Sequence, residues 1–115
     1  MRNDELSIQS MDFAVSIINL VKDLKVKHES VISNQIGRSG TSIGANIREA
    51  QYAHGKADFI AKLHIALKET AETEYWIKLL SESGYIDEET GDSLLGDCLE
   101  IKRILVSSIN TAKSK

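Results

Sequence analysis

Apolar residues recur at helical spacing in four segments of this 115-residue chain. Between residues 4 and 26 they form two adjacent rows, Phe13, Ile17, Leu20 and Leu24 in one and Met11, Ala14, Ile18 and Val21 in the other. Steps of three and four place such positions on one side of an α-helix. Similar rows lie between residues 30 and 55, between residues 58 and 83, and from residue 87 onward. The pattern therefore predicts four long helices.

Residues that begin or stop helices mark the boundaries of these segments. Ser30 and Asp87 are suited to cap the second and fourth helices, because their side-chain oxygens can accept hydrogen bonds from a first-turn N–H. Gly55 and Gly84 are suited to end the second and third helices, because glycine adopts the left-handed conformation that often follows a helix. We therefore expect short connections, at residues 27–30, 55–58 and 84–87.

Helices joined so tightly run antiparallel to one another. The chain contains no proline and only seven glycines, so little in it interrupts a long helix. We expect one domain over residues 1–115 that is all-α, an antiparallel up-down-up-down four-helix bundle.

The second helix carries a row of glycines where an ordinary helix would carry larger residues. Gly37, Gly40 and Gly44 line up beside its isoleucine stripe, and each costs about 1 kcal/mol relative to alanine in a helix interior. A residue without Cβ lets another helix axis come closer, so we expect a neighbouring helix or subunit to approach this row. The alternative is that residues 38–42 form a loop between two short helices.

Polar residues near the apolar sides of the second and third helices are Asn46, Glu49, Glu72 and Glu74. An unpaired buried carboxylate is costly, so we expect Glu74 to join a buried network with Asn46, Arg48 or Tyr52. The functional alternative is a carboxylate-bound metal, but the Glu-x-x-His pairs of di-iron bundles are absent. We predict no metal, no cofactor and no catalytic residue.

Tyr75 and Trp76 are adjacent and therefore point about 100° apart around the third helix. Only one of them can lie in the centre of the bundle. We expect the other to be an interface anchor, since tyrosine and tryptophan are enriched at interfaces.

The formal net charge of −3 argues against a sequence-independent grip on phosphates. In an up-down bundle, however, one end gathers basic residues, and the candidate nucleic-acid contacts are Arg2, Arg48, Lys56, Lys62 and Lys113. Acidic residues dilute this end, so a solvated charged surface is the alternative.

The lone Cys98 is expected to be a small core residue. The first residues do not form a signal peptide and no apolar run is long enough to span a bilayer, which predicts a cytoplasmic protein with no membrane contact.

The stretch SGTSIGANIREAQYAHGKADFIAKLHIAL, followed by ETEYWIKLLSESGYI, resembles the four-helix bundle proteins encoded in the intervening sequences of bacterial 23S ribosomal RNA genes. The matching segments are Ser42 to Ala50, Phe59 to Leu67, Glu72 to Glu74, and Ser83 to Ile86, within a resemblance that extends from about Val31 to Ile86. Departures are Gly44 in place of proline, Arg48 before Glu49, and Ala50 in place of glycine.

The resemblance implies a bundle that assembles as a ring-shaped homopentamer. Some similar proteins bind a reverse transcriptase and nucleic acid through a basic surface of the ring, and this chain is less basic than they are. We therefore expect a non-enzymatic, homo-oligomeric interaction protein, with a pentamer of this chain as the expected assembly. The alternative is a protein that binds RNA or a nucleic-acid-processing protein through the basic end of the bundle.

Overall fold

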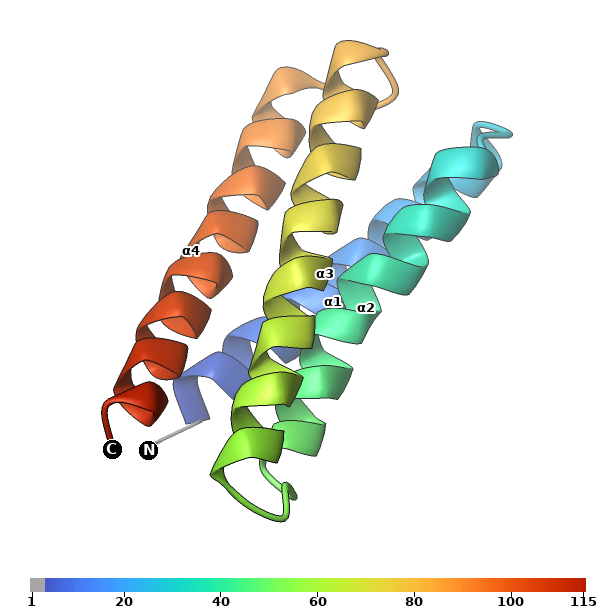
Figure 1. Ribbon diagram of the computed structural model, residues 1–115. Coiled ribbons are helices and arrows are strands. Elements are labelled where there is room, and N and C mark those ends of the chain that lie inside the picture. Colours follow the sequence, from blue (N-terminus) through green and yellow to red (C-terminus); the bar gives the residue numbers. More distant parts are fainter. Residues whose placement is uncertain (1–3) are drawn as a thin grey trace.

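The four predicted helices are present in the computed structural model, which describes residues 4–115. They are α1 (Asp4–Val26), α2 (Val31–Ala50), α3 (Lys56–Glu82) and α4 (Glu88–Lys113), and each runs opposite to the one before it (Figure 1). The described part of the chain is an antiparallel up-down-up-down four-helix bundle about 47 Å long. The fold class predicted from the sequence is confirmed. Because α2 is continuous through residues 38–42, the alternative of a loop there is wrong.

Two of the predicted helix boundaries are confirmed in detail. The Asp87 carboxylate accepts a hydrogen bond from the N–H of Thr90, with 2.7 Å between Oδ1 and the nitrogen, and so caps α4. Gly84 has φ of +82°, the left-handed conformation that lets the chain turn away after α3. Ile86 then folds back into the core.

The start of α2 differs from the prediction, because Ser30 makes no side-chain capping bond. The preceding residue caps the helix instead. The carboxylate of Glu29 accepts hydrogen bonds from the N–H groups of Ile32 (3.0 Å) and Ser33 (2.7 Å). Its longer side chain reaches the same first-turn donors from one residue further back.

The end of α2 also differs from the prediction, because the helix stops at Ala50 and not at Gly55. The N–H groups of Tyr52 and Ala53 donate to the carbonyls of Glu49 (3.0 Å) and Ala50 (3.1 Å). Bonds that span three residues tighten the last turn and close the helix. Gly55 is extended, with φ of −173°, and directly precedes α3.

The core confirms the main apolar row of α1, since Phe13, Ile17, Leu20 and Leu24 are all buried. Buried isoleucines and leucines from the other helices, together with Cys98, complete it. Of the three glycines in the row, Gly40 leaves the least room beside α1. A Cβ on Gly40 would lie only 2.9 Å from both Cγ1 and Cγ2 of Ile17. The neighbour that the glycine row accommodates is thus a helix of the same chain.

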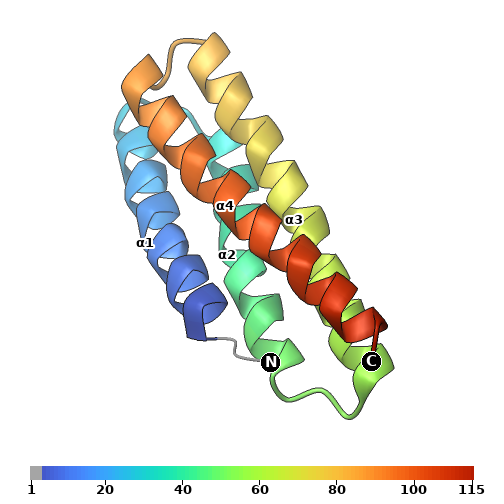
Figure 2. The same cartoon turned by 90° about the vertical axis from the view of Figure 1, so that its left-hand side faces the viewer.

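The helices do not contact one another equally. Four pairs of helices are in contact, and the contact between α1 and α4 is the smallest of these. Figure 2 shows these two helices close together where α4 begins and further apart where it ends. The bundle is therefore more open at the end that holds the last turn of α4.

Candidate interaction surfaces

The first helix carries a second apolar row on the side that faces away from the core. Ile8, Met11, Val15 and Ile18 are 61, 62, 53 and 43% exposed, respectively. Their steps of three, four and three place them on one face. We call these four residues the α1 outer stripe. A surface helix is ordinarily polar opposite its buried side, so this stripe is an apolar face without a partner in the described part of the chain.

The sequence pattern pointed only partly to this stripe. Met11 and Ile18 belong to the second row predicted for the first helix, but Ile8 and Val15 were missed. The pattern placed both rows on one broad apolar face of the first helix. In the structure, Ala14 and Val21 are half-buried towards α2, whereas Met11 and Ile18 remain exposed. The signal for the stripe is the heptad-like spacing of residues 8, 11, 15 and 18.

The basic candidates lie at the end of the bundle where α2 ends and α3 begins. Arg48, Lys56 and Lys113 are exposed there, whereas Arg2 lies outside the described residues. Lys62 forms an ion pair with Glu49, with 3.4 Å between Nζ and Oε1. Lys62 and Glu49 thus partly neutralise each other. The predicted basic end exists, with acidic residues among its lysines.

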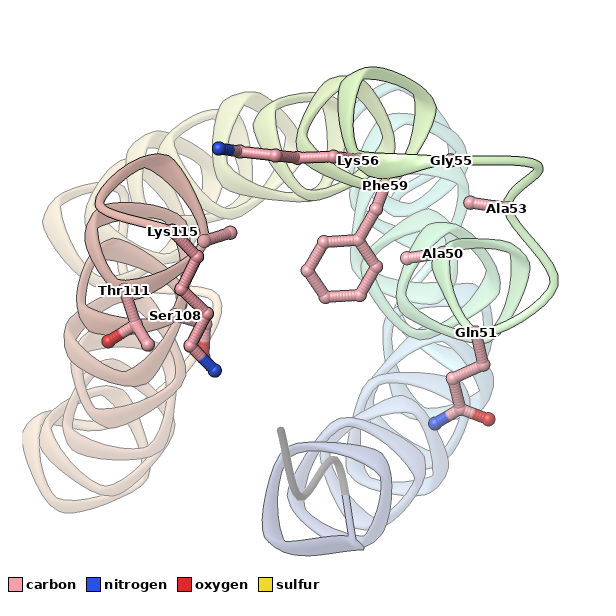
Figure 3. Close-up of a pocket in the computed structure, with 10 residues that line it drawn as sticks. Ala50, Gln51, Ala53, Gly55, Lys56, Phe59, Ser108, Thr111 and Lys115 are labelled. Carbon is pink, nitrogen blue, oxygen red and sulfur yellow. The ribbon is translucent and has the colours of Figure 1, made fainter.

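A groove of about 480 Å³ opens at this same end. Its walls come from the last turn of α2, the start of α3 and the last turns of α4. Figure 3 shows the ring of Phe59 pointing into it, and Lys56 and Lys115 are among its lining residues. The groove therefore combines an apolar floor with ammonium groups at the end of the bundle.

The two adjacent aromatic residues have different environments. Trp76 is half-buried against the core, and its Nε1–H donates to the carboxylate of Glu72 at 3.0 Å. Tyr75 is 59% exposed, and its ring forms a T-shaped pair with that of Trp76, with 5.0 Å between the ring centroids. Tyr75 is therefore the member of the pair that is available to a partner.

The predicted network around Glu74 does not form. Its carboxylate pairs with the ammonium groups of Lys78 (3.1 Å) and Lys102 (3.4 Å), which ties α3 to α4. The hydrogen bond from Lys78, with help from Lys102, lowers the pKa of the Glu74 carboxyl below its usual value. The sequence pattern placed Glu74 towards α2, whereas α3 turns it towards α4. Ion pairs at the helix surface replace the expected buried network.

The other polar candidates also have local partners. Glu72 pairs with Arg38 of α2, and the side-chain amide of Asn46 donates to the carbonyl of Ser42, one turn earlier in its own helix, at 2.9 Å. Within the described residues, no three His, Cys, Asp or Glu side chains are grouped so that they could hold a metal ion.

Cys98 is buried, as expected of a core residue. Its Sγ lies 3.4 Å from the carbonyl oxygen of Thr70, to which the thiol can donate. Burial raises the pKa of the thiol to about 12. A thiol with so high a pKa is a poor nucleophile at neutral pH.

Comparisons with known proteins agree with the fold. The model of the 23S rRNA-intervening sequence protein family matches residues 3–107. A crystal structure of a protein of unknown function from the S23 ribosomal protein family of Bacteroides thetaiotaomicron VPI-5482 is 51% identical, with a TM-score of 0.93. The match covers 96% of this chain and 99% of that one. No curated protein matches the chain.

Among the described residues, no helix is both long and apolar enough to cross a membrane.

Proposed function

Because this chain belongs to the 23S rRNA-intervening sequence protein family, whose bundle it shares, we propose that it is a non-enzymatic protein that acts by assembling with copies of itself. The assembly is a ring, and the family resemblance suggests five copies. The observation that carries this proposal is the α1 outer stripe.

Burial of this stripe supplies the driving force for assembly. Four large apolar side chains, 43 to 62% exposed, lie in one row on a single helix. Removing apolar surface from water contributes roughly 25 cal/mol per Å², and contiguous exposed apolar patches mark interaction sites. The row has the spacing that lets one helix pack into the surface of another. A second copy of the chain is a partner that is always present at matching concentration.

The test places charge in the stripe and measures the mass of the assembly. In the variant Met11→Glu/Val15→Glu, two carboxylates would be buried without partners, so we expect a monomer by light scattering at micromolar concentration. The matched control is Val31→Glu, since Val31 is 74% exposed but lies outside the stripe. The control keeps the mass of the unaltered chain. Equal masses for the stripe variant and the unaltered chain, with helicity unchanged by circular dichroism, would reject the role of the stripe.

A second candidate function is binding of structured RNA through the basic end. The favouring observation is that Arg48, Lys56 and Lys113 are exposed together there, and none of them takes part in the ion pairs found among the described residues. Phosphate contacts make the affinity fall as salt rises. We expect Arg48→Ala/Lys56→Ala to weaken binding and flatten this salt dependence. No detectable binding to structured RNA at low salt would remove this candidate.

A further inference from the structure

We infer that the α1 outer stripe of one copy docks onto a surface formed by α3 and α4 of the next copy, with the two bundles pointing the same way. This inference rests on the proposed self-assembly and adds to it the identity and direction of the receiving surface. The composition of the receiving surface, its height along the bundle and its charge all support this pairing.

The receiving surface lies along the outer seam between α3 and α4. The ion pair between Glu74 and Lys102 joins the two helices there. Leu99 and Val106, 42 and 41% exposed, are three residues before and four after Lys102, so they share its face of α4. On α3 the exposed residues Ala71 and Tyr75 lie three residues before and one residue after Glu74. We call Ala71, Tyr75, Leu99 and Val106 the α3/α4 outer face.

The α1 outer stripe and this face lie at the same height along the bundle. Phe13 and Ile101 line one hollow between α1 and α4, and Leu20 and Leu94 line the next. The middle of the stripe is therefore level with residues 99–106 of α4. In a ring whose axis runs parallel to the bundles, equal heights let the stripe meet the face without a shift along the axis.

The two surfaces are different and lie on different sides of the molecule, since α1 is next to α2 and α4 and away from α3 (Figure 2). An interface between two different surfaces is repeated from copy to copy and forms a closed ring when the rotation closes. An antiparallel pairing of the stripe with itself would stop at two copies. The separation of the surfaces therefore fits a ring.

The charges at the two ends of the surfaces fix the direction of docking. Lys22 continues the stripe one turn beyond Ile18, and Asp92 lies seven residues before Leu99 on the same face of α4. Both are exposed and lie towards the same end of the bundle. At the other end, the exposed Glu5 of α1 is opposite in charge to the exposed Lys68 of α3, which is three residues before Ala71. Parallel docking joins opposite charges at both ends.

The first test exchanges the charges of Lys22 and Asp92. Lys22→Glu and Asp92→Lys each place like charges together, and we expect each to raise the concentration at which half of the assembly dissociates by about fivefold. The double variant Lys22→Glu/Asp92→Lys restores opposite charges, so it should return to the value of the unaltered chain. If the two single effects instead add, so that the double variant dissociates at a higher concentration than either single variant, the pairing of Lys22 with Asp92 is wrong.

The second test cross-links the surfaces. Ile8→Cys and Val106→Cys are prepared as separate proteins, and the buried Cys98 serves as an unreactive internal thiol. Parallel docking predicts a disulfide-linked dimer when the two are mixed and oxidised, and little when either is oxidised alone. The matched control uses Ser107→Cys in place of Val106→Cys. Ser107 is also exposed but points about 100° away around α4, so this variant should form less of the linked dimer with Ile8→Cys.

The outcomes separate this inference from the proposed function. If the unaltered chain is a monomer, self-assembly itself is wrong. If the chain is oligomeric but Ile8→Cys alone forms the dimer, assembly stands and α1 pairs with α1. If cross-linking instead requires Ala45→Cys, on the exposed side of α2, the receiving surface is the groove beside α1. Either of the last two results would overturn the α3/α4 assignment.

Discussion

The variant Gly40→Ala tests whether the close approach of α1 and α2 requires the missing side chain. The added Cβ would lie 2.9 Å from both γ carbons of Ile17 and 3.3 Å from its Cβ. Rotating Ile17 about χ1 does not relieve the overlap. Two of the three staggered positions face Gly40, and a side chain with two γ carbons always fills at least one of them.

The expected change in the free energy of unfolding of Gly40→Ala is the difference between two opposing effects. Replacing glycine by alanine inside a helix gains about 1 kcal/mol from helix propensity. Forcing an extra methyl group into a packed contact costs about 1–3 kcal/mol, and the upper part of this range applies because Ile17 is fully buried. We expect a net loss of about 1–2 kcal/mol in the free energy of unfolding.

The assay is urea denaturation followed by circular dichroism at one fixed protein concentration, since assembly would make stability depend on concentration. The matched control is Gly96→Ala, because Gly96 is also inside a helix but has open space where the added methyl group would lie. It should gain about 1 kcal/mol. If Gly40→Ala is as stable as Gly96→Ala, the close-approach explanation of the glycine row is wrong.

Three further predictions concern polar and titratable groups. Glu29→Ala should lower the free energy of unfolding by about 1 kcal/mol in the same assay, because two first-turn N–H groups of α2 lose their acceptor. Cys98 should stay unmodified by a thiol reagent at pH 8 in the folded protein and react once unfolded, since burial raises its pKa to about 12; rapid labelling of the folded protein would contradict this. The lowered pKa of Glu74 stabilises the fold above the ordinary carboxyl pKa. Glu74→Gln should therefore be less stable than the unaltered chain at pH 7, with the difference vanishing as the pH falls through the folded-state pKa, and a difference independent of pH would refute the role of this ion pair.

The helices could be predicted from the sequence because each buried row repeats every three or four residues along its helix. The row from Phe13 to Leu24 was assigned correctly for this reason. The boundaries of α2 were harder, since several residues near each end can satisfy the same backbone groups. Glu29 competes with Ser30 for the first-turn donors, and the bonds made by Tyr52 and Ala53 end the helix before Gly55 is reached.

The surfaces were less predictable, because helical spacing gives the faces of one helix but not the helices that cover them. The exposed residues Ile8 and Val15 have the same residue types and spacing as core residues. Only the placement of α2 and α4 around α1 shows that nothing in the described part of the chain covers them. Glu74 illustrates the same limit. Its position on α3 does not by itself show whether α2 or α4 lies beside it, and in the structure it pairs with Lys78 of its own helix and Lys102 of α4.

The mass of the unaltered chain in solution tests the central claim most directly. One chain has a mass of 12.7 kDa. Light scattering at micromolar concentration and near-neutral pH should give a discrete mass close to five times this value. A mass of 12.7 kDa across the micromolar range would contradict the claim that copies of the chain assemble through the exposed face of α1.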